Sequence, residues 1–236
     1  MSHADVAIAT LVAPRRLGRR RARNFDVRRL AEGHREIPVK RVLDVIAALL
    51  ILVAIAPLGV AIVVALWREG GPLFYGHPRI GRGGRGFRCW KFRTMVPDAD
   101  RRLAELLARD EAARAEWARD FKLRDDPRVT ALGRWLRATS LDELPQLYNV
   151  LRGEMSLVGP RPIVGAELSR YGDHAAAYLR CTPGLTGLWQ VSGRNDVSYQ
   201  DRVQLDRRYA ERRSLWLDLA ILARTPGAVL RRAGAY

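Results

Sequence analysis

The longest hydrophobic stretch of the chain is residues 45–66, which carry no charge. As one straight helix these 22 residues would be about 33 Å long, close to the roughly 30 Å hydrocarbon core of a bilayer. Pro57 near the middle, with Gly59 after it, favours a kink instead. Two arms of about 11–12 residues, roughly 17 Å each, would then enter the membrane and return. The pattern leaves a spanning helix and a re-entrant hairpin as equal alternatives.

The segment after the apolar run predicts a β-hairpin. Residues 70–72 are a Gly-Gly-Pro turn signal, and residues 73–79 and 87–94 have the composition of two short strands. The turn between them, residues 81–86, matches the letters of the dinucleotide-binding GxGxxG motif. That motif opens a helix, whereas here a second strand follows, so we interpret it as a hairpin turn.

Helical spacing of apolar residues dominates the rest of the chain. It predicts helices over residues 98–121, 132–137 and 199–213. Ser140 and Glu143 have the spacing of a capping box, so a further helix is expected to start at Ser140. Residues 214–231 fit either a core helix or an interfacial helix with Trp216 at the lipid headgroups.

These elements predict a mainly α protein with one small β-hairpin. We expect a basic, largely disordered or surface-lying extension at residues 1–37, a membrane helix at 38–68 and a globular domain at 69–236. Residues 1–41 hold eleven Lys and Arg against four Asp and Glu. We do not expect a signal peptide, because the apolar run starts too late, is too long and lacks a small-residue cleavage pattern.

Composition narrows the class of protein. The chain has 41 Lys and Arg against 25 Asp and Glu, a net charge of +16. Its 48% hydrophobic residues exclude a wholly disordered chain. Cys89 and Cys181 cannot build a disulfide framework or a four-cysteine zinc site, so we expect reduced structural thiols in a cytosolic setting. The charge predicts an anionic partner: nucleic acid, phospholipid or a phosphorylated substrate.

The densest polar cluster lies in residues 125–162. Asp142 and Glu143 fit the first turn of a helix, where acids interact favourably with the helix dipole. The same carboxylates, beside arginines, are suited to supply a nucleophile and a ligand for a hard cation. Arg137 and Arg161, the latter on a Gly-Pro-Arg-Pro turn, carry guanidinium groups that match phosphate oxygens. The set fits phosphoryl transfer, and the purely structural interpretation stays open beside it.

Three stretches behind the basic-flanked apolar run resemble the bacterial sugar transferase family, the monotopic phosphoglycosyl transferases. They are Lys-Phe-Arg-Thr-Met (residues 91–95), Ser-Leu-Asp-Glu-Leu-Pro-Gln (140–146) and Ser-Leu-Val-Gly-Pro-Arg-Pro (156–162). Residues 183–194 and the ending Gly-Ala-Tyr are similar to the exopolysaccharide subgroup. The resemblance covers roughly residues 38–236. It leads us to expect the short catalytic form, without the extra transmembrane helices of longer members.

The resemblance implies a role for each matching residue. Asp142 would be the covalent nucleophile, and Glu143 and Asp142 would hold Mg²⁺. The family bends a re-entrant helix at a Ser-Pro pair; this chain has Ala56 and Pro57, which keeps the proline and lacks the serine hydroxyl. The implied membrane-anchoring residues are Lys40, Arg41 and Pro57, and the implied substrate-binding residues are Lys91, Arg93, Arg137, Arg161 and Pro162.

The resemblance also implies a function. A phosphoglycosyl transferase domain at residues 69–236 would transfer galactose-1-phosphate or glucose-1-phosphate from a UDP-sugar to undecaprenyl phosphate, releasing UMP. This is the first membrane step of exopolysaccharide synthesis, at the cytoplasmic face of the bacterial inner membrane. Interfacial amphipathic helices and anionic phospholipid would hold the domain there. Downstream glycosyltransferases are expected partners, nucleic acid is not, and a homodimer stays open.

One alternative from another class is a membrane-tethered nucleic-acid-binding protein. The net charge of +16 and the Arg-rich extension suit it. The sequence shows no helix-turn-helix, zinc-finger or RNP motif, and acids cluster with the arginines where a nucleic acid would meet repulsion. We therefore favour the transferase.

Overall fold

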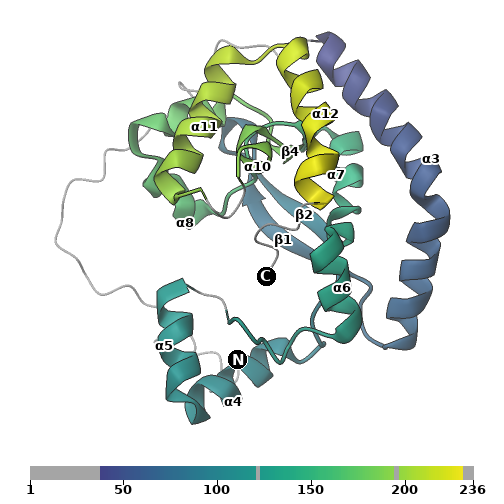
Figure 1. Cartoon of the computed structure of the whole chain (residues 1–236), viewed down its shortest axis with the longest axis vertical. Helices are drawn as coiled ribbons and strands as arrows, with labels where there is room; N and C mark the ends of the chain where they lie inside the picture. The colour runs from purple at the N-terminus through teal and green to yellow at the C-terminus, as the bar shows by residue number, and fades with distance from the viewer. Residues whose placement is uncertain (1–37, 121–122, 194–196, 231–236) are drawn as a thin grey trace.

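The apolar run forms one long helix, α3 (Pro38–Arg68), which curves along the outer side of the molecule (Figure 1). It is part of a computed structural model that describes residues 38–120, 123–193 and 197–230, so the predicted extension at residues 1–37 lies outside the described residues. At 31 residues, α3 is about 46 Å long, and it is long and apolar enough to cross a membrane. Most of its surface is uncovered, with Val53 75% exposed.

Pro57 lies inside α3 and does not divide it. The helix continues on both sides of the proline, so two separate arms joined at Pro57 are not present. Proline removes one backbone hydrogen-bond donor and crowds the preceding turn. In a helix of this length, the other backbone hydrogen bonds keep the helix continuous. The predicted membrane helix at residues 38–68 is therefore present as one curved helix.

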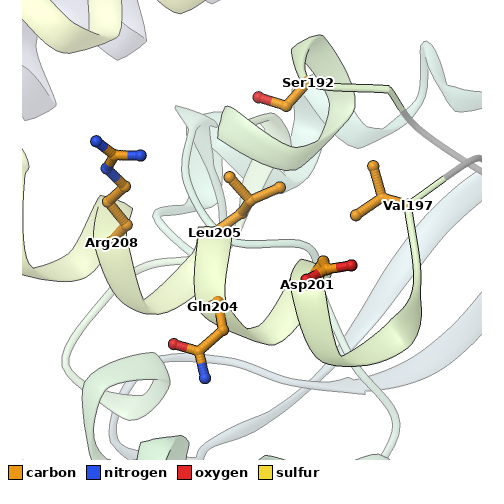
Figure 2. A pocket seen from close by; sticks show the side chains of 6 residues that line it. All are labelled: Ser192, Val197, Asp201, Gln204, Leu205 and Arg208. Carbon is orange, nitrogen blue, oxygen red and sulfur yellow. The ribbon is translucent and has the colours of Figure 1, made fainter.

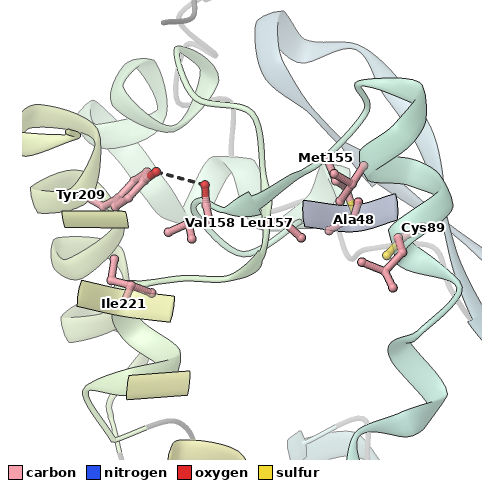
Figure 3. Packing of buried hydrophobic residues seen from close by; sticks show 9 residues of the cluster. Ala48, Cys89, Met155, Leu157, Val158, Tyr209 and Ile221 are labelled. Atoms are coloured by element: carbon pink, nitrogen blue, oxygen red, sulfur yellow. Dashed lines mark hydrogen bonds between the residues drawn. The ribbon is translucent and has the colours of Figure 1, made fainter. Parts of the chain in front are cut away.

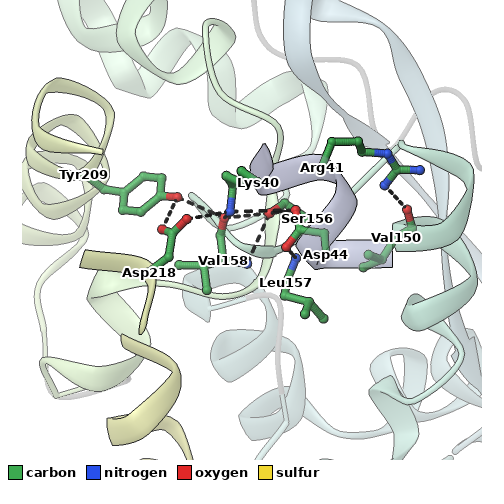
Figure 4. Close-up of polar contacts among 9 residues, drawn as sticks. All are labelled: Lys40, Arg41, Asp44, Val150, Ser156, Leu157, Val158, Tyr209 and Asp218. Atoms are coloured by element: carbon green, nitrogen blue, oxygen red, sulfur yellow. Dashed lines mark hydrogen bonds and ion pairs between the residues drawn. The ribbon is translucent and has the colours of Figure 1, made fainter. Parts of the chain in front are cut away.

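The amino-terminal end of α3 is fixed to the domain by polar contacts (Figure 4). Lys40 Nζ donates to Asp218 Oδ2 at 2.7 Å and to the Val158 carbonyl at 3.1 Å. Arg41 donates to the carbonyls of Val150 and Leu151. Asp44 is buried one turn later and accepts hydrogen bonds from Ser156 Oγ at 2.7 Å and from the Leu157 N–H at 3.2 Å.

The carboxyl-terminal end of α3 is fixed to the same domain. The buried guanidinium of Arg93 donates to the carbonyls of Leu66 and Gly70. Ile62 and Leu66 of α3 pack in one apolar cluster with Phe92 and Leu136. Both ends of the helix therefore lie against one body, and the exposed apolar surface lies between them.

The predicted hairpin is confirmed. Strands β1 (Phe74–Ile80) and β2 (Gly86–Phe92) are antiparallel and pair from Phe74 with Phe92 to Ile80 with Gly86. The glycine-rich turn between them is a short 3-10 turn, η1 (Arg82–Gly84), in which Gly83 has φ 66°. No helix opens there, so the GxGxxG letters are a hairpin turn.

Helices make up most of the remaining described chain. They are α4 (Ala99–Arg109), α5 (Glu111–Asp120), α6 (Ala131–Thr139), α7 (Gln146–Arg152), α8 (Gly165–Leu168), α9 (Ala175–Leu179), α10 (Leu188–Val191), α11 (Tyr199–Arg212) and α12 (Leu215–Leu230), with 3-10 turns η2 (Leu141–Glu143) and η3 (Ser169–His174). Two short strands, β3 (Ser156–Val158) and β4 (Gly184–Thr186), pair in parallel, a pairing that the sequence did not reveal. The described part is thus mainly helical with small sheets, as predicted.

The core joins segments that are far apart in the chain (Figure 3). Its buried members come from α3, β2, α7, β3, α11 and α12: Ala48, Cys89, Leu147, Val150, Met155, Leu157, Val158, Tyr209 and Ile221. The Tyr209 hydroxyl donates to the Val158 carbonyl at 3.0 Å within this core. Cys89 and Cys181 are both free and buried, in agreement with reduced structural thiols.

Two helix predictions are wrong. The helix expected over residues 98–121 is two helices, α4 and α5, which break at Asp110 because its backbone is extended (φ −117°, ψ 111°). The capping box at Ser140 does not form: Ser140 has a left-handed backbone, φ 59°, and ends α6. The next α-helix, α7, begins only at Gln146.

The two interpretations of residues 214–231 both describe part of α12. Ile221 and Asp218 are buried on one side of the helix. Trp216 is 82% exposed and Leu219 is 54% exposed. α12 is therefore a core helix on one face and presents an uncovered apolar surface on the other.

Candidate active site

Asp142 and Glu143 lie on the tight turn η2, between α6 and α7. The left-handed backbone of Ser140 stops α6 and turns the chain, and one 3-10 turn follows. This turn packs against β2, the strand that carries Lys91. The site therefore joins the carboxylate turn to the hairpin.

Lys91 holds both carboxylates. Its Nζ lies 3.1 Å from Asp142 Oδ2 and 2.7 Å from Glu143 Oε1. Asp142 is buried, whereas the side chain of Glu143 is 39% exposed. Among the described residues, Lys91 is the only hydrogen-bond partner of the Asp142 side chain. Asp142 thus sits at the inner end of the site with one cation beside it.

Burial and charge set the protonation of this group. Burial raises the pKa of Asp142, the Lys91 ammonium opposes that shift, and the Glu143 carboxylate adds to it. Burial alone would lower the pKa of Lys91, but Glu143 and Asp142 raise it above its ordinary value. Lys91 is therefore a permanent cation that favours the ionised form of Asp142.

Arg137 is close enough to Asp142 for their charges to interact. Thr130 caps α6 by accepting from the Gly133 N–H at 2.9 Å, and α6 then carries Arg137 toward the turn. Arg137 Nε donates to Thr94 Oγ1 at 2.9 Å. Burial lowers the pKa of Arg137, and the nearby Asp142 charge opposes that shift. A partly buried guanidinium group thus faces the carboxylate.

Arg161 lies on a loop whose backbone is firmly held. The Gly159 N–H donates to the Thr186 carbonyl at 2.9 Å, and the Gly184 N–H donates to the Pro160 carbonyl at 2.8 Å. The Arg161 guanidinium stacks on the ring of Trp189, 5.2 Å from its centroid. Burial and the neighbouring Arg202 lower the pKa of Arg161, and Glu143 opposes that shift. The loop therefore brings a cation toward Glu143, with Pro162 partly buried beside it.

Three residues that were predicted to bind substrate or to anchor the chain in the membrane make hydrogen bonds within the domain, away from Asp142. Arg93 reaches carbonyls at the end of α3, and its contacts favour a structural role over the predicted substrate binding. Lys40 and Arg41 donate to the domain rather than outward, so their predicted contact with lipid headgroups stays a prediction. Arg93, Lys40 and Arg41 together hold α3 against the domain that carries the site.

The structure adds residues that sequence reasoning missed. Arg79, on β1, and Arg202, on α11, both lie near Arg161. Asp206 is buried and accepts a hydrogen bond from the Tyr171 hydroxyl at 2.7 Å, while its other carboxylate oxygen has no partner among the described residues. Burial raises the pKa of Asp206 to about 7. The helical spacing of Arg202 and Asp206, four residues apart, was the only signal that they share a face.

The carboxylate pair fits a magnesium ion only together with substrate. The described residues contain no group of three His, Cys, Asp or Glu side chains that could hold a metal. Mg²⁺ is commonly bound by one or two carboxylates plus phosphate oxygens and water, which Asp142 and Glu143 match. Lys91 already occupies one oxygen of each carboxylate, and the Asp142 oxygen that Lys91 does not contact would be available to a metal.

A separate pocket of about 430 Å³ lies on the surface beside α11 (Figure 2). It is lined by Ser192, Val197, Asp201, Gln204, Leu205 and Arg208. None of the predicted site residues contributes to it, so it does not form part of the Asp142 site.

A comparison of the sequence with known protein families identifies one that covers most of the chain. The model of the family described as bacterial sugar transferase matches residues 35–232. The chain belongs to this family. The resemblance inferred from the three stretches is thereby confirmed.

Relatives within the family share most of this chain. A Salmonella typhimurium protein named undecaprenyl-phosphate galactose phosphotransferase is 56% identical over 198 residues, covering 84% of this chain and 42% of that protein. The exopolysaccharide production protein ExoY of Sinorhizobium fredii is 52% identical, covering 84% and 88%. The undecaprenyl-phosphate glucose phosphotransferase of Komagataeibacter xylinus is 40% identical, covering 78% and 34%. The chain thus spans less than half the length of the Salmonella and Komagataeibacter relatives.

Proposed function

We propose that the chain is a UDP-sugar:undecaprenyl-phosphate sugar-1-phosphate transferase of exopolysaccharide synthesis, specific for galactose or glucose. The observation that carries the proposal is the buried Asp142, whose only described partner is Lys91, with Arg137 and Arg161 nearby. A carboxylate held ionised beside several cations suits attack on a phosphate ester. The names of the relatives supply the substrates.

The first step forms a covalent intermediate. One Asp142 oxygen attacks the β-phosphorus of the UDP-sugar, and the bond from that phosphorus to the bridging oxygen breaks. UMP leaves with the electron pair, and the sugar phosphate stays on Asp142. Lys91 holds Asp142 ionised before the attack, and Arg161 offsets charge on the donor. A Mg²⁺ held by Asp142 and Glu143 would supply further neutralisation of phosphate charge.

The second step regenerates the carboxylate. A phosphate oxygen of undecaprenyl phosphate attacks the same phosphorus, and the bond to Asp142 breaks. The product is undecaprenyl diphosphate-sugar. Arg137 is suited to the acceptor phosphate, because its neighbour Leu136 packs against Ile62 and Leu66 of the membrane helix.

The contacts of α3 support a monotopic arrangement with both helix ends at the cytoplasmic face. Lys40 at one end and Leu66 at the other contact the same domain, which cannot lie on two sides of a bilayer. The exposed Trp216 and Leu219 of α12 would lie at the interface with anionic phospholipid. Impermeant maleimide applied to inside-out vesicles should label both Val39→Cys and Trp67→Cys, since the native cysteines are buried. Labelling from opposite sides would contradict this arrangement.

A screen for UMP release tests the activity. The purified chain, Mg²⁺ and undecaprenyl phosphate are incubated with UDP-galactose, UDP-glucose or their N-acetylated counterparts. We expect UMP release with UDP-galactose or UDP-glucose, and an increase in protein mass by one hexose phosphate when the lipid is omitted. Absence of UMP release with every donor, together with salt-sensitive binding of DNA, would favour the nucleic-acid-binding alternative.

A further inference from the structure

Three arginines meet on the side of the site that faces α11. Arg161 follows β3, Arg79 lies on β1, and Arg202 lies on α11. Ile80, which follows Arg79, pairs with Ile163 in the Arg161 loop, and the Arg161 and Arg202 guanidinium groups lie over the same Trp189 ring, so the three arginines are close. Among the described residues, neither Arg79 nor Arg161 makes an ion pair, and Arg202 pairs with Glu167 at 3.1 Å. Two of the three guanidinium groups are therefore outside any ion pair in the described part of the chain.

Aromatic rings hold two of these guanidinium groups. Arg202 lies 5.5 Å from the centroid of the Trp189 ring and 4.6 Å from that of Tyr199. Arg161 stacks on the same Trp189 ring. Stacking on a ring face leaves the edge N–H groups of a guanidinium available for anions. The rings thus orient the cations without neutralising them.

Unpartnered donors mark the same place. Trp189 is only 5% exposed, and its indole N–H has no partner among the described residues. The same holds for Arg202 Nε. A buried donor without an acceptor is costly, about 1–3 kcal/mol, so such groups usually meet water or a ligand. Two unpartnered buried donors beside guanidinium groups that lack an ion pair are suited to an anionic ligand.

We infer that Arg79, Arg161 and Arg202 bind the diphosphate of the nucleotide donor, with Trp189 and Tyr199 holding the guanidinium groups in place. This inference rests on the proposed function and extends it to residues outside the carboxylate turn. A diphosphate matches three guanidinium groups better than a single phosphate does, because each group can donate two parallel hydrogen bonds. The subsite lies beside Glu143, so the reacting phosphorus would reach Asp142.

The test is equilibrium binding of UDP, UMP and uridine to the full chain in detergent, measured by calorimetry. UDP carries no sugar phosphate to transfer, so binding is measured without turnover. We expect Arg202→Gln and Arg79→Gln each to weaken UDP binding about tenfold, to weaken UMP binding less, and to leave uridine binding unchanged. Arg202→Lys keeps the charge and loses the planar fork, and should weaken UDP binding by an intermediate factor.

A matched control lies on the same helix. Arg207 pairs with Glu211 on α11, and Arg207→Gln should bind UDP as the unmodified chain does. Thermal unfolding of each variant shows whether it is folded. If Arg202→Gln is not folded, the UDP affinities of Arg79→Gln and Arg202→Lys decide whether the subsite exists. UDP affinity within twofold of the unmodified chain in the folded variants would overturn the subsite. UMP release by the unmodified chain reports separately on the proposed function.

Discussion

Two clusters in this structure each contain one lysine and two carboxylates. They differ in how many hydrogen bonds the carboxylates accept. Lys40 lies between Asp44 and Asp218, and Lys91 lies between Asp142 and Glu143. In the first cluster every carboxylate oxygen has a partner: Asp44 accepts from Ser156 and Leu157, and Asp218 accepts from Lys40 and Tyr209. In the second, Lys91 is the only described hydrogen-bond partner of the Asp142 side chain.

This difference distinguishes a cluster that stabilises the fold from a cluster that is suited to catalysis. A buried carboxylate with all its hydrogen bonds satisfied is a fixed part of the core and a poor nucleophile. A buried carboxylate with a free oxygen can attack once it is ionised, and a neighbouring cation favours its ionised form. The burial of the carboxylates does not distinguish the two clusters. The number of hydrogen-bond partners of each carboxylate does distinguish them.

The largest expected effect is on the rate of UMP release. Asp142→Asn removes the nucleophile and should lower UMP release by at least about 10³-fold. Asp44→Asn is its matched control, because it neutralises an equally buried carboxylate in the other cluster. UMP release from Asp142→Asn at the rate of the unmodified chain would overturn the nucleophile assignment.

The next effect is on stability. Asp218→Ala leaves the Lys40 ammonium, 18% exposed, without its closest partner and should lower the free energy of unfolding by about 3–5 kcal/mol. Asp142→Ala should cost less, because Lys91 is 30% exposed and keeps Glu143. Thermal or urea unfolding compares the two. A larger loss for Asp142→Ala would reverse the assignment of the clusters.

The third prediction concerns pH. The nucleophile must be deprotonated, so the rate rises with pH through the pKa of Asp142, which burial raises. Lys91 opposes that rise, and Lys91→Met should therefore raise the pKa further and move the acid limb of the UMP-release profile to higher pH. Lys40→Met, in the other cluster, should leave the limb in place. A limb that moves to lower pH in Lys91→Met would contradict the electrostatic role.

The smallest expected effects come from removing one hydroxyl group beside each of the two clusters. Ser156→Ala removes a hydrogen bond to Asp44 and should lower stability by about 1–3 kcal/mol without changing UMP release per folded molecule. Thr94→Val removes the acceptor of Arg137 and should lower kcat/KM about tenfold with little change in the melting temperature. The reverse pattern would show that Thr94, and not Ser156, stabilises the fold.

Local signals in the sequence predicted much of the fold. Strand-like composition and the glycine-rich turn predicted the β1–β2 hairpin, and helices were predicted where α6, α11 and α12 are found. The capping box at Ser140 failed because tertiary packing turned the chain there through a left-handed residue. Local propensity is routinely overridden in this way when a tight turn must deliver side chains to a site.

The site could be predicted only as a set of residue types. Asp142, Glu143, Arg137 and Arg161 stood close together in the sequence, and phosphate chemistry follows from them. Lys91 is 51 residues from Asp142, and no sequence pattern reports that β2 packs on the carboxylate turn. The role of Lys40 depended likewise on Asp218, which no local signal connects to it.

The pairing of Lys40 with Asp218 has a consequence for biosynthesis. The two residues are 178 positions apart, so at 5–20 residues per second Lys40 leaves the ribosome on the order of 10–40 s before its partner is made. During that interval the ends of α3 have no domain to hold them. The apolar surface of α3, which the finished domain also leaves uncovered, would then meet lipid or a chaperone while translation continues.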